Sequence, residues 1–388
     1  MDMAWVLDTL FTLFSFTLII LMVPGFAMLE AGLVRTKNVT AVLTINTMIY
    51  IVASLTFFFI GYKLAFGGWD GSSMSKYAAF LFQMAFVGKT VNIMSGGVSE
   101  RTRVIPLSIF TIFMAGFIYP LVVNLTWGAD LLKDTIFDIS NMHDLAGSTV
   151  IHSTGGWALL AAILIIGSRK GKYTKRGIKV IPASNIPLVV LGALLLWIGW
   201  FGFNGGSVGS ISSKNAADTV AFVVMNTNNA GLVGGLIVFI LSYLTYKKFD
   251  ITMVLNGALG GLVAITAGAD VLTPVESLTV GLIGGILVFY AVPFFDKLKL
   301  DDPVGALSVH LVNGIWGTLA VGLFGKADLF SQIKGIIEIG IFTFVISYII
   351  IFIINKFIPF RAEEEEEIEG LDVTECGIEA YPEFKRTF

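Results

Sequence analysis

The chain has 388 residues, of which 55% are hydrophobic and 14% are charged, and its formal net charge is −3 at pH 7. A soluble domain carries about 25% charged residues, so this composition cannot cover a water-exposed surface and predicts an integral membrane protein that faces the lipid bilayer. The small net charge argues against nucleic-acid binding, and the single cysteine, Cys376, excludes an intrachain disulfide or a cysteine-based metal cluster.

Eleven apolar runs are long enough to cross a bilayer, because a spanning helix needs about 20 mostly apolar residues. In chain order they are 5–33, 40–62, 78–97, 104–126, 145–168, 185–206, 218–246, 251–269, 274–295, 303–325 and 334–358. We therefore predict an all-α integral membrane domain over residues 1–360 with eleven transmembrane helices, followed by a separate tail over residues 361–388.

Basic residues gather in every second loop between these runs. One set of loops carries Arg35 and Lys37, Arg101 and Arg103, six basic residues within 169–179, and Lys247 and Lys248. The alternate loops carry Asp70, then Asp130, Asp134 and Asp138, then Asp270 and Glu276. Cytoplasmic loops are enriched in lysine and arginine. The pattern predicts a multi-pass protein of the plasma membrane with its N-terminus outside and its C-terminus in the cytoplasm.

The tail opens with five consecutive glutamates at 363–367. A run of like charges is typical of a solvated segment. Because the loop 169–179 carries the opposite charge, the two segments are also candidates for mutual contact. We interpret the tail as a cytoplasmic regulatory segment.

Two of the three histidines lie in matching patterns 158 residues apart. Asp144 precedes His152 by eight residues, and Asp302 precedes His310 by eight. The shared pattern is D-x2-G-x4-H-x3-G-x10-G, with paired glycines at 147 and 305, 156 and 314, and 167 and 325. Five coincident residues at one offset indicate an internal repeat.

The predicted topology makes this repeat an inverted one. The first copy opens the fifth run from outside and the second opens the tenth from the cytoplasm, which predicts two inverted five-helix repeats and a final helix. Transporters of this kind bind substrate near the bilayer midplane. Eight helical residues advance about 12 Å into a core about 30 Å thick. His152 and His310 should therefore meet in the middle.

Other interpretations of these four residues stay open. Either histidine could be a buried group bonded to backbone, or the two could hold a metal, although no carboxylate or thiol shares the predicted site. We predict neither a metal nor a cofactor. Asp144 and Asp302 stand at helix N-termini, where a carboxylate caps free N–H groups. That structural role could explain Asp302, whereas structure and function are equally compatible with Asp144.

Seven segments carry a family resemblance that covers the whole chain. They are GFAMLEAGLVRTKN (25–38), FQMAF (82–86), SERTR (99–103), DLAGSTVIH (144–152), WIGWFGFNGGS (197–207), DDPVGALSVH (301–310) and GLDVTECGIEAY (370–381). Together they resemble the ammonium transporter (Amt/Rh/Mep) family of the bacterial or archaeal Amt type.

The resemblance implies a homotrimer of eleven-helix protomers, each with its own pore for ammonium or ammonia, and no enzyme activity. It assigns seven residues to the pore: His152 and His310 as the pore histidines, Phe86 and Phe203 as a stacked gate, and Trp127 and Ser207, with Phe82 nearby, as the outer recruitment site. It makes Asp144 the structurally essential aspartate. It also implies that a PII-type signal protein docks on the cytoplasmic face.

The chain departs from the family pattern at two charged positions. Lys89 stands where an apolar residue is usual, and it follows Phe82 and Phe86 at i, i+4, i+7 spacing, which predicts one shared helix face. It could snorkel to a vestibule, occupy the cation position and impair conduction, or form a salt bridge across the trimer interface. Glu30 replaces a common aromatic residue, and we expect it to be solvated at the cytoplasmic helix end.

We therefore expect ammonium or ammonia transport across the plasma membrane by outer cation recruitment, a phenylalanine gate and a twin-histidine pore. The alternative is an ammonium sensor or transceptor on the same scaffold, with transport impaired by Lys89. A membrane oxidoreductase that uses the histidines as metal ligands is a third hypothesis, which the lack of further ligands disfavours.

Overall fold

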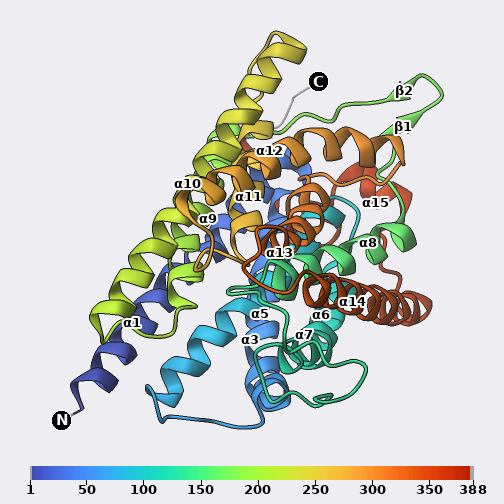
Figure 1. The fold of residues 1–388 in the computed structure, drawn as a ribbon. Coiled ribbons are helices and arrows are strands. Elements are labelled where there is room, and N and C mark those ends of the chain that lie inside the picture. The colour runs from blue at the N-terminus through green and yellow to red at the C-terminus, as the bar shows by residue number, and fades with distance from the viewer. Residues whose placement is uncertain (1, 385–388) are drawn as a thin grey trace.

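A computed structural model describes residues 2–384, and helices make up most of this part of the chain (Figure 1). The α-helices are α1 (Met3–Ile20), α2 (Met22–Leu33), α3 (Val39–Thr56), α4 (Tyr62–Phe66), α5 (Lys76–Val98), α6 (Val104–Phe113), α7 (Tyr119–Asn124), α8 (Thr154–Ile166), α9 (Ile186–Gly206), α10 (Lys214–Tyr246), α11 (Ile251–Ile265), α12 (Pro274–Lys297), α13 (Asn313–Leu323), α14 (Leu329–Phe357), α15 (Glu364–Glu369) and α16 (Leu371–Thr374). Short 3₁₀ turns are η1 (Thr36–Asn38) and η6 (Pro382–Phe384), and π-helical turns are η2 (Phe57–Gly61), η3 (Met114–Ile118), η4 (Ser148–Ser153) and η5 (Leu307–Val312). Two-residue strands β1 (Tyr173–Thr174) and β2 (Gly177–Ile178) form an antiparallel hairpin.

Eight helical segments are long and apolar enough to cross a membrane: Met3–Leu33, Thr36–Phe66, Val104–Asn124, Ser148–Ile166, Ile186–Gly206, Lys214–Tyr246, Pro274–Lys297 and Leu329–Phe357. The other three predicted runs also contain helices, namely α5, the shorter apolar α11, and η5 with α13. The all-helical membrane architecture is therefore confirmed, whereas a total of eleven crossings stays a prediction.

Small residues bring three of these helices close together. A Cβ on Gly261 of α11, or on Gly281 of α12, would overlap the carbonyl oxygen of Ala230 on α10. Glycine at such positions lets membrane helices approach to backbone contact. Large apolar side chains remain exposed on the flanks, including Phe59, Leu236 and Phe357, as expected for a surface that faces lipid.

The loops gather on two opposite faces. The N-terminal face carries the start of α1, which donates the Trp5 Nε1 hydrogen bond to the Gly71 carbonyl over 3.1 Å, and the contact of His143 with Asp270. The tail face carries the loops 99–103 and 167–185, the hairpin and the tail. These faces lie at the bottom and the top of Figure 1, respectively.

The tail packs against the tail-face loops, so the predicted contact between loop 169–179 and the acidic run is present. Lys170 donates its backbone N–H to Glu367 over 2.6 Å and its Nζ to Glu364 over 2.7 Å. Arg361 also pairs with Glu367, which is buried. The run is therefore only partly solvated. Residues 385–388 of the predicted tail lie outside the described residues.

Candidate functional site

The two copies of the sequence repeat adopt the same local structure. The Asp144 carboxylate accepts hydrogen bonds of 2.8–3.0 Å from four backbone N–H groups, those of residues 147–150. The Asp302 carboxylate accepts three, from Val304, Gly305 and Leu307, over 2.7–3.2 Å. Each aspartate thus satisfies free N–H groups of the helix that bears a histidine.

Each histidine lies in a π-helical turn, His152 in η4 and His310 in η5. A glycine precedes each turn with left-handed backbone, Gly147 at φ 108° and Gly305 at φ 81°, a conformation that residues with a Cβ rarely adopt. Single π-helical turns are common at functional sites because they redirect side chains. The shared backbone geometry of the repeat therefore fixes the orientation of both imidazoles.

The two imidazoles meet inside the protein, as the repeat predicts. His152 Nδ1 lies 3.1 Å from His310 Nδ1, and the ring planes are 18° apart with centroids separated by 5.2 Å. Trp200 stacks on His152 at 5.1 Å and is fixed by its Nε1 hydrogen bond to Thr266. Nε2 of His152 is buried and has no hydrogen-bond partner in the described residues.

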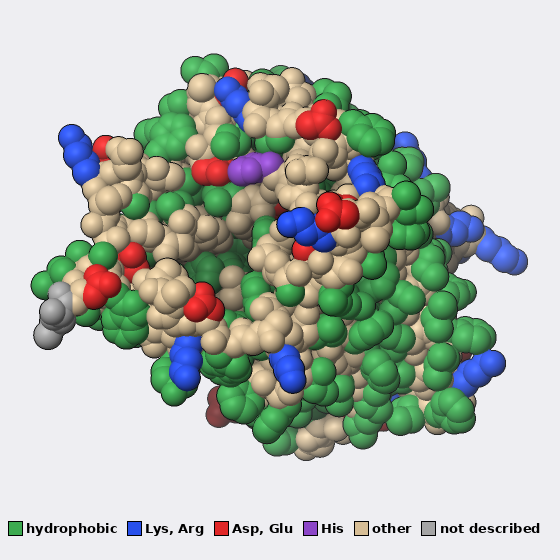
Figure 2. All heavy atoms as spheres, turned by 60° about the horizontal axis from the view of Figure 1, so that its bottom comes forward, with side chains coloured by type: hydrophobic (Ala, Val, Ile, Leu, Met, Phe, Trp, Pro, Cys, Tyr) green, Lys and Arg blue, Asp and Glu red, His purple; other side chains and the backbone are tan. Residues whose placement is uncertain are grey.

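A cavity of about 420 Å³ opens on the N-terminal face. Its lining includes four of the predicted recruitment and gate residues, which are Phe82 and Phe86 on α5, Trp127 after α7, and Ser207 at the end of α9. Trp127 Nε1 donates to the Asp144 carbonyl over 2.8 Å, which orients the indole. Ser207 Oγ donates to the Phe203 carbonyl over 2.8 Å, so its lone pairs remain available as acceptors. Figure 2 shows this face hollowed near its centre, with hydrophobic side chains on the floor.

Two buried phenylalanines separate this cavity from the histidines. The Phe86 and Phe203 rings are in contact, with centroids 4.5 Å apart, but they meet edge to face and are not stacked as the resemblance implies. The Phe82 ring lies 4.7 Å from that of Phe86. Phe203 in turn lies 5.6 Å from His152. The aromatic rings therefore form a continuous column from the N-terminal face to the histidine pair.

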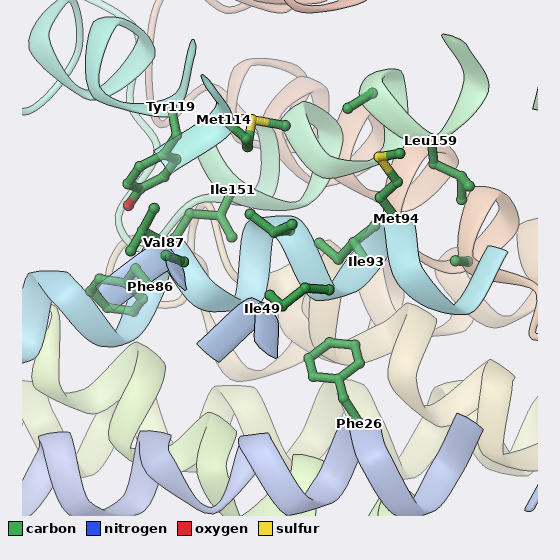
Figure 3. Close-up of a cluster of buried hydrophobic side chains, with 14 of the residues drawn as sticks. Phe26, Ile49, Phe86, Val87, Ile93, Met94, Met114, Tyr119, Ile151 and Leu159 are labelled. Atoms are coloured by element: carbon green, nitrogen blue, oxygen red, sulfur yellow. The ribbon is translucent and has the colours of Figure 1, made fainter. Parts of the chain in front are cut away.

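A second, much smaller cavity of about 20 Å³ lies on the tail side of His310. Phe26, whose ring is 6.2 Å from His310, and Ile93 are among its lining residues. Figure 3 shows Phe26 on α2 reaching toward the α5 segment that carries Ile93. Asn256 and Val304 line both this cavity and a third one of about 170 Å³ on the tail face. Cavities thus lie on both sides of the histidine pair.

Lys89 lies on α5 between residues that line these two cavities, but its own side chain lines neither. Phe86 lines the cavity on one side and Ile93 the cavity on the other, and helical periodicity places Lys89 on the same strip of α5. The lysine is 1% exposed, and its Nζ has no hydrogen-bond partner among residues 2–384. A side chain so buried reaches neither a vestibule nor an outer surface, which disfavours the snorkelling and trimer-interface alternatives.

The expectation that Glu30 is solvated is wrong, because the residue is 1% exposed. Its carboxylate accepts hydrogen bonds from Asn46 on α3 and Ser95 on α5. The sequence interpretation also missed Trp200 and Phe26 beside the histidines. The i, i+3 spacing of Trp200 and Phe203 could have indicated a shared helix face, whereas the position of Phe26 depends on helix packing.

Charged groups outside the membrane-spanning segments form a network on the tail face. Arg169 makes hydrogen bonds with both oxygens of the Asp301 carboxylate, over 2.9 Å each, and also pairs with Glu100. Burial alone would raise the pKa of Asp301, but Arg169 and the charge of Arg101 outweigh it and hold this pKa well below its usual range. The network ties three loops together near the mouth of the 170 Å³ cavity, which Arg169 also lines.

This fold, with cavities on both sides of a buried histidine pair, defines a polytopic membrane transport protein. The chain belongs to the ammonium transporter family, because a sequence model of the Ammonium Transporter Family matches residues 10–381. That family consists of transporters and channels, not enzymes.

Individual relatives agree with this assignment. The chain is 33% identical to ammonium transporter Amt2 of Archaeoglobus fulgidus, with 97% of this chain and 88% of the relative covered. It is also 33% identical to the ammonium transporter of Bacillus subtilis, with 96% and 98% covered. Among solved structures, one described as a Sensor Amt Protein superposes with a TM-score of 0.90 at 32% identity, covering 97% of this chain and 99% of that one. Candida albicans Mep2 shares the fold, with a TM-score of 0.81 at 24% identity, and 93% and 87% covered.

Proposed function

We propose that the protein transports ammonium or ammonia across the plasma membrane through a pore along its histidine pair. In this proposal the N-terminal face is outside, the tail face is cytoplasmic, the chain crosses the bilayer eleven times, and three copies assemble into a homotrimer of pores. The relatives named ammonium transporters support the substrate, and the alternation of basic loops supports the orientation.

Recruitment begins in the 420 Å³ cavity at the N-terminal face. An indole or phenyl face attracts a cation through its ring quadrupole, and Trp127 and Phe82 supply such rings. Ser207 adds a hydroxyl acceptor, because its own proton is used on the Phe203 carbonyl. The cation is held here before it loses its hydration shell.

Phe86 and Phe203 act as the gate. Their rings are in contact and buried, so hydrated sodium or potassium would have to shed water without compensation, which is costly. An ammonium ion carries transferable protons, and the buried His152–His310 pair supplies nitrogen atoms that accept hydrogen bonds and relay them. Proton and ammonia therefore separate at the gate and pass along the histidines.

The observation that carries the proposal is the contact between His152 and His310 with a cavity on each side. The test is ammonium-dependent current and methylammonium uptake by the purified protein in liposomes. We expect uptake above that of protein-free liposomes, without potassium or sodium current. A protein that binds ammonium but passes none in either assay would contradict transport.

A second candidate function is ammonium sensing. Lys89 favours it, because the lysine is buried, has no hydrogen-bond partner in the described part of the chain, and would oppose a cation if its charge lay beside the path. The Sensor Amt Protein has the same fold at 32% identity. A sensor would bind ammonium without conducting it, so the liposome assays above, combined with a binding measurement, separate the two functions.

The resemblance also supports regulation from the tail face. We propose that a PII-type signal protein docks on the surface formed by loop 169–179 and the tail, and that it closes the pore. Contacts such as Lys170 with Glu364 would hold both segments of this surface together. A pull-down with purified PII-type protein and the full-length transporter tests this partner, and loop charge-reversal variants should lose the binding.

A further inference from the structure

The 20 Å³ cavity on the tail side of His310 contains a carboxylate and amide groups that the proposed relay does not use. Glu30 from α2, Asn92 from α5 and Asn256 from α11 line it together with His310. A space of this size holds one molecule as small as water or ammonium. The cavity therefore suits a single small ligand rather than a chain of water.

Glu30 is fixed in position by two neutral donors. Ser95 Oγ donates to one carboxylate oxygen over 2.8 Å, and Asn46 Nδ2 donates to the other over 2.9 Å. Gly96 leaves room for the carboxylate, because a Cβ at position 96 would lie only 3.2 Å from Cδ and from Oε1 of Glu30. Two donors leave further lone pairs of the carboxylate free to accept.

Asn92 is oriented by the same cluster. Its Nδ2 donates to Asn46 Oδ1 over 2.5 Å, which fixes which end of the amide is the acceptor. Its Oδ1 is buried and has no hydrogen-bond partner in the part of the chain described, although a buried acceptor normally has one. A ligand that only donates hydrogen bonds would satisfy it.

We propose that this cavity binds one ammonium ion, formed where ammonia that has passed the histidines takes up the relayed proton, and that the ion donates hydrogen bonds to Glu30 and Asn92 before release on the tail face. The ion carries four N–H donors and a positive charge, which match a carboxylate and an unpaired amide oxygen. The shared lining residues Asn256 and Val304 lead onward to the 170 Å³ cavity. The inference rests on the proposed function, because ammonia and the relayed proton reach this site through the pore.

A competing explanation for the buried carboxylate of Glu30 is that it serves as the counter-ion of a positively charged Lys89. Lys89 stands about one helical turn before Asn92 on α5, but its Nζ makes no hydrogen bond to the carboxylate. A site for ammonium and a counter-ion for Lys89 predict different behaviour when the lysine is removed.

The first experiment detects binding without requiring conduction. Infrared difference spectra of the full-length protein in lipid would compare ammonium chloride with potassium chloride in the carboxylate stretching region. We expect an ammonium-specific carboxylate band that disappears in Glu30→Gln and persists in Glu338→Gln, a matched change of a carboxylate on α14 that faces Lys334. A band that persists in Glu30→Gln overturns the proposal.

The second experiment is a double-mutant cycle on flux with wild type, Glu30→Gln, Lys89→Ile and the double variant. Because a hydrogen-bonded charge is lost, Glu30→Gln should lower ammonium flux by about ten-fold in both backgrounds. An effect that vanishes in the Lys89→Ile background makes Glu30 a counter-ion only and overturns the proposal. Glu30→Asp keeps the negative charge, so its ammonium flux should lie between those of wild type and Glu30→Gln. This order of fluxes would show that the loss in Glu30→Gln comes from the missing charge and not from misfolding.

The two proposals can fail separately. A wild-type protein that shows the Glu30-dependent band but passes no ammonium contradicts transport and supports this site. A wild-type protein that conducts ammonium without such a band supports transport and overturns this site.

Discussion

Nδ1 of His152 lies 3.1 Å from Nδ1 of His310, although 158 residues separate them in the chain. At this distance one nitrogen must donate and the other accept, since two protonated Nδ1 atoms would face each other with their hydrogens. The pair therefore holds a matched set of tautomers. Its Nε2 atoms point away from the shared contact, and that of His152 has no hydrogen-bond partner among the described residues.

Replacing both rings tests whether this contact is the conducting path. His152→Ala with His310→Ala should reduce selective ammonium uptake in liposomes to the level of protein-free vesicles, because no imidazole remains to accept hydrogen bonds past the gate. The oligomer, followed by size-exclusion chromatography, should persist, since Asp144 and Asp302 still cap both helices. The control is His143→Ala, which changes the histidine outside the pair. Unchanged uptake and selectivity in the double variant would eliminate the pore assignment.

Lys89→Ile should raise ammonium flux if the lysine opposes the cation. Two like charges in a poorly solvated site repel by several kcal/mol, roughly 4 kcal/mol at 4 Å, so a rise of at least about ten-fold is expected. Wild type and variant are compared in liposomes of equal protein content at several pH values. Lys63→Ile, which removes an exposed lysine, is the control. Equal fluxes for wild type and Lys89→Ile at every pH would remove the main support for the sensor alternative.

The sequence contained enough to predict the helices and the histidine contact. Apolar length locates a spanning segment without knowledge of its neighbours, and the spacing of Asp144 and His152 repeats in Asp302 and His310. The burial of Glu30 could not be derived in this way, because it depends on Asn46 and Ser95 from two other helices.

Backbone irregularity and packing account for the remaining differences. The helices that carry the histidines begin with π-helical turns at Ser148 and Leu307, a few residues inside the predicted runs, since left-handed glycines and capping aspartates occupy the preceding positions. The stacking of Trp200 on His152 joins α9 to η4. A hydropathy pattern indicates neither the π-helical hydrogen bonding nor the partner of a given aromatic face.

Asp301→Asn should destabilise the tail face strongly. Asp301 is 0% exposed and bonded to Arg169, and removing one partner of a buried ion pair costs about 3–5 kcal/mol. Thermal unfolding in detergent measures the loss. Asp296→Asn removes a partly exposed pair with Lys172 and should cost at most about 1 kcal/mol. Equal melting temperatures for wild type and Asp301→Asn would contradict this account.

The same pair predicts an acid limit to stability. Because the pKa of Asp301 is held below its usual value in the folded protein, its stabilising effect is complete above the unfolded pKa of about 3.9. It is lost as the pH falls through the lower, folded value. The difference in melting temperature between wild type and Asp301→Asn should therefore be constant near neutral pH and shrink below about pH 4.

His143 and Asp270 predict the opposite pH dependence on the N-terminal face. The hydrogen bond to Asp270, 3.0 Å long, raises the pKa of His143 against the effect of burial. Protonated His143 therefore stabilises the folded protein fully when the pH is below its unfolded pKa of about 6.5. This stabilisation is lost as the pH rises through the higher pKa of the folded state. Asp270→Asn should lower the melting temperature more at pH 5.5 than at pH 8.5. A pH-independent difference would show that the pair does not titrate in this range.

Arg103 should hold the tail on its face. Its guanidinium pairs with Glu366 over 2.5 Å and lies 3.5 Å from Glu375, and the hydrogen bond with Glu366 raises the pKa of Arg103, which keeps it charged. Arg103→Ala should therefore release the tail and increase cleavage after its glutamates by a glutamate-specific protease. Lys170→Ala removes an exposed pair worth at most about 1 kcal/mol and should leave the cleavage rate close to wild type.

Removing the tail entirely tests whether its docking matters for function. Deletion of residues 362–388 removes the contacts of Glu366 and Glu367 with Arg103, Arg361 and Lys170, so the loops around the tail-face cavity lose their support. Ammonium flux or binding of a PII-type protein should change by a measurable factor, and Arg103→Ala should shift the same quantity in the same direction. Because Arg103→Ala keeps every residue of the tail, agreement between the two variants identifies docking as the cause. If neither flux nor partner binding changes in the deletion variant, the tail has no regulatory role and its packing is structural alone.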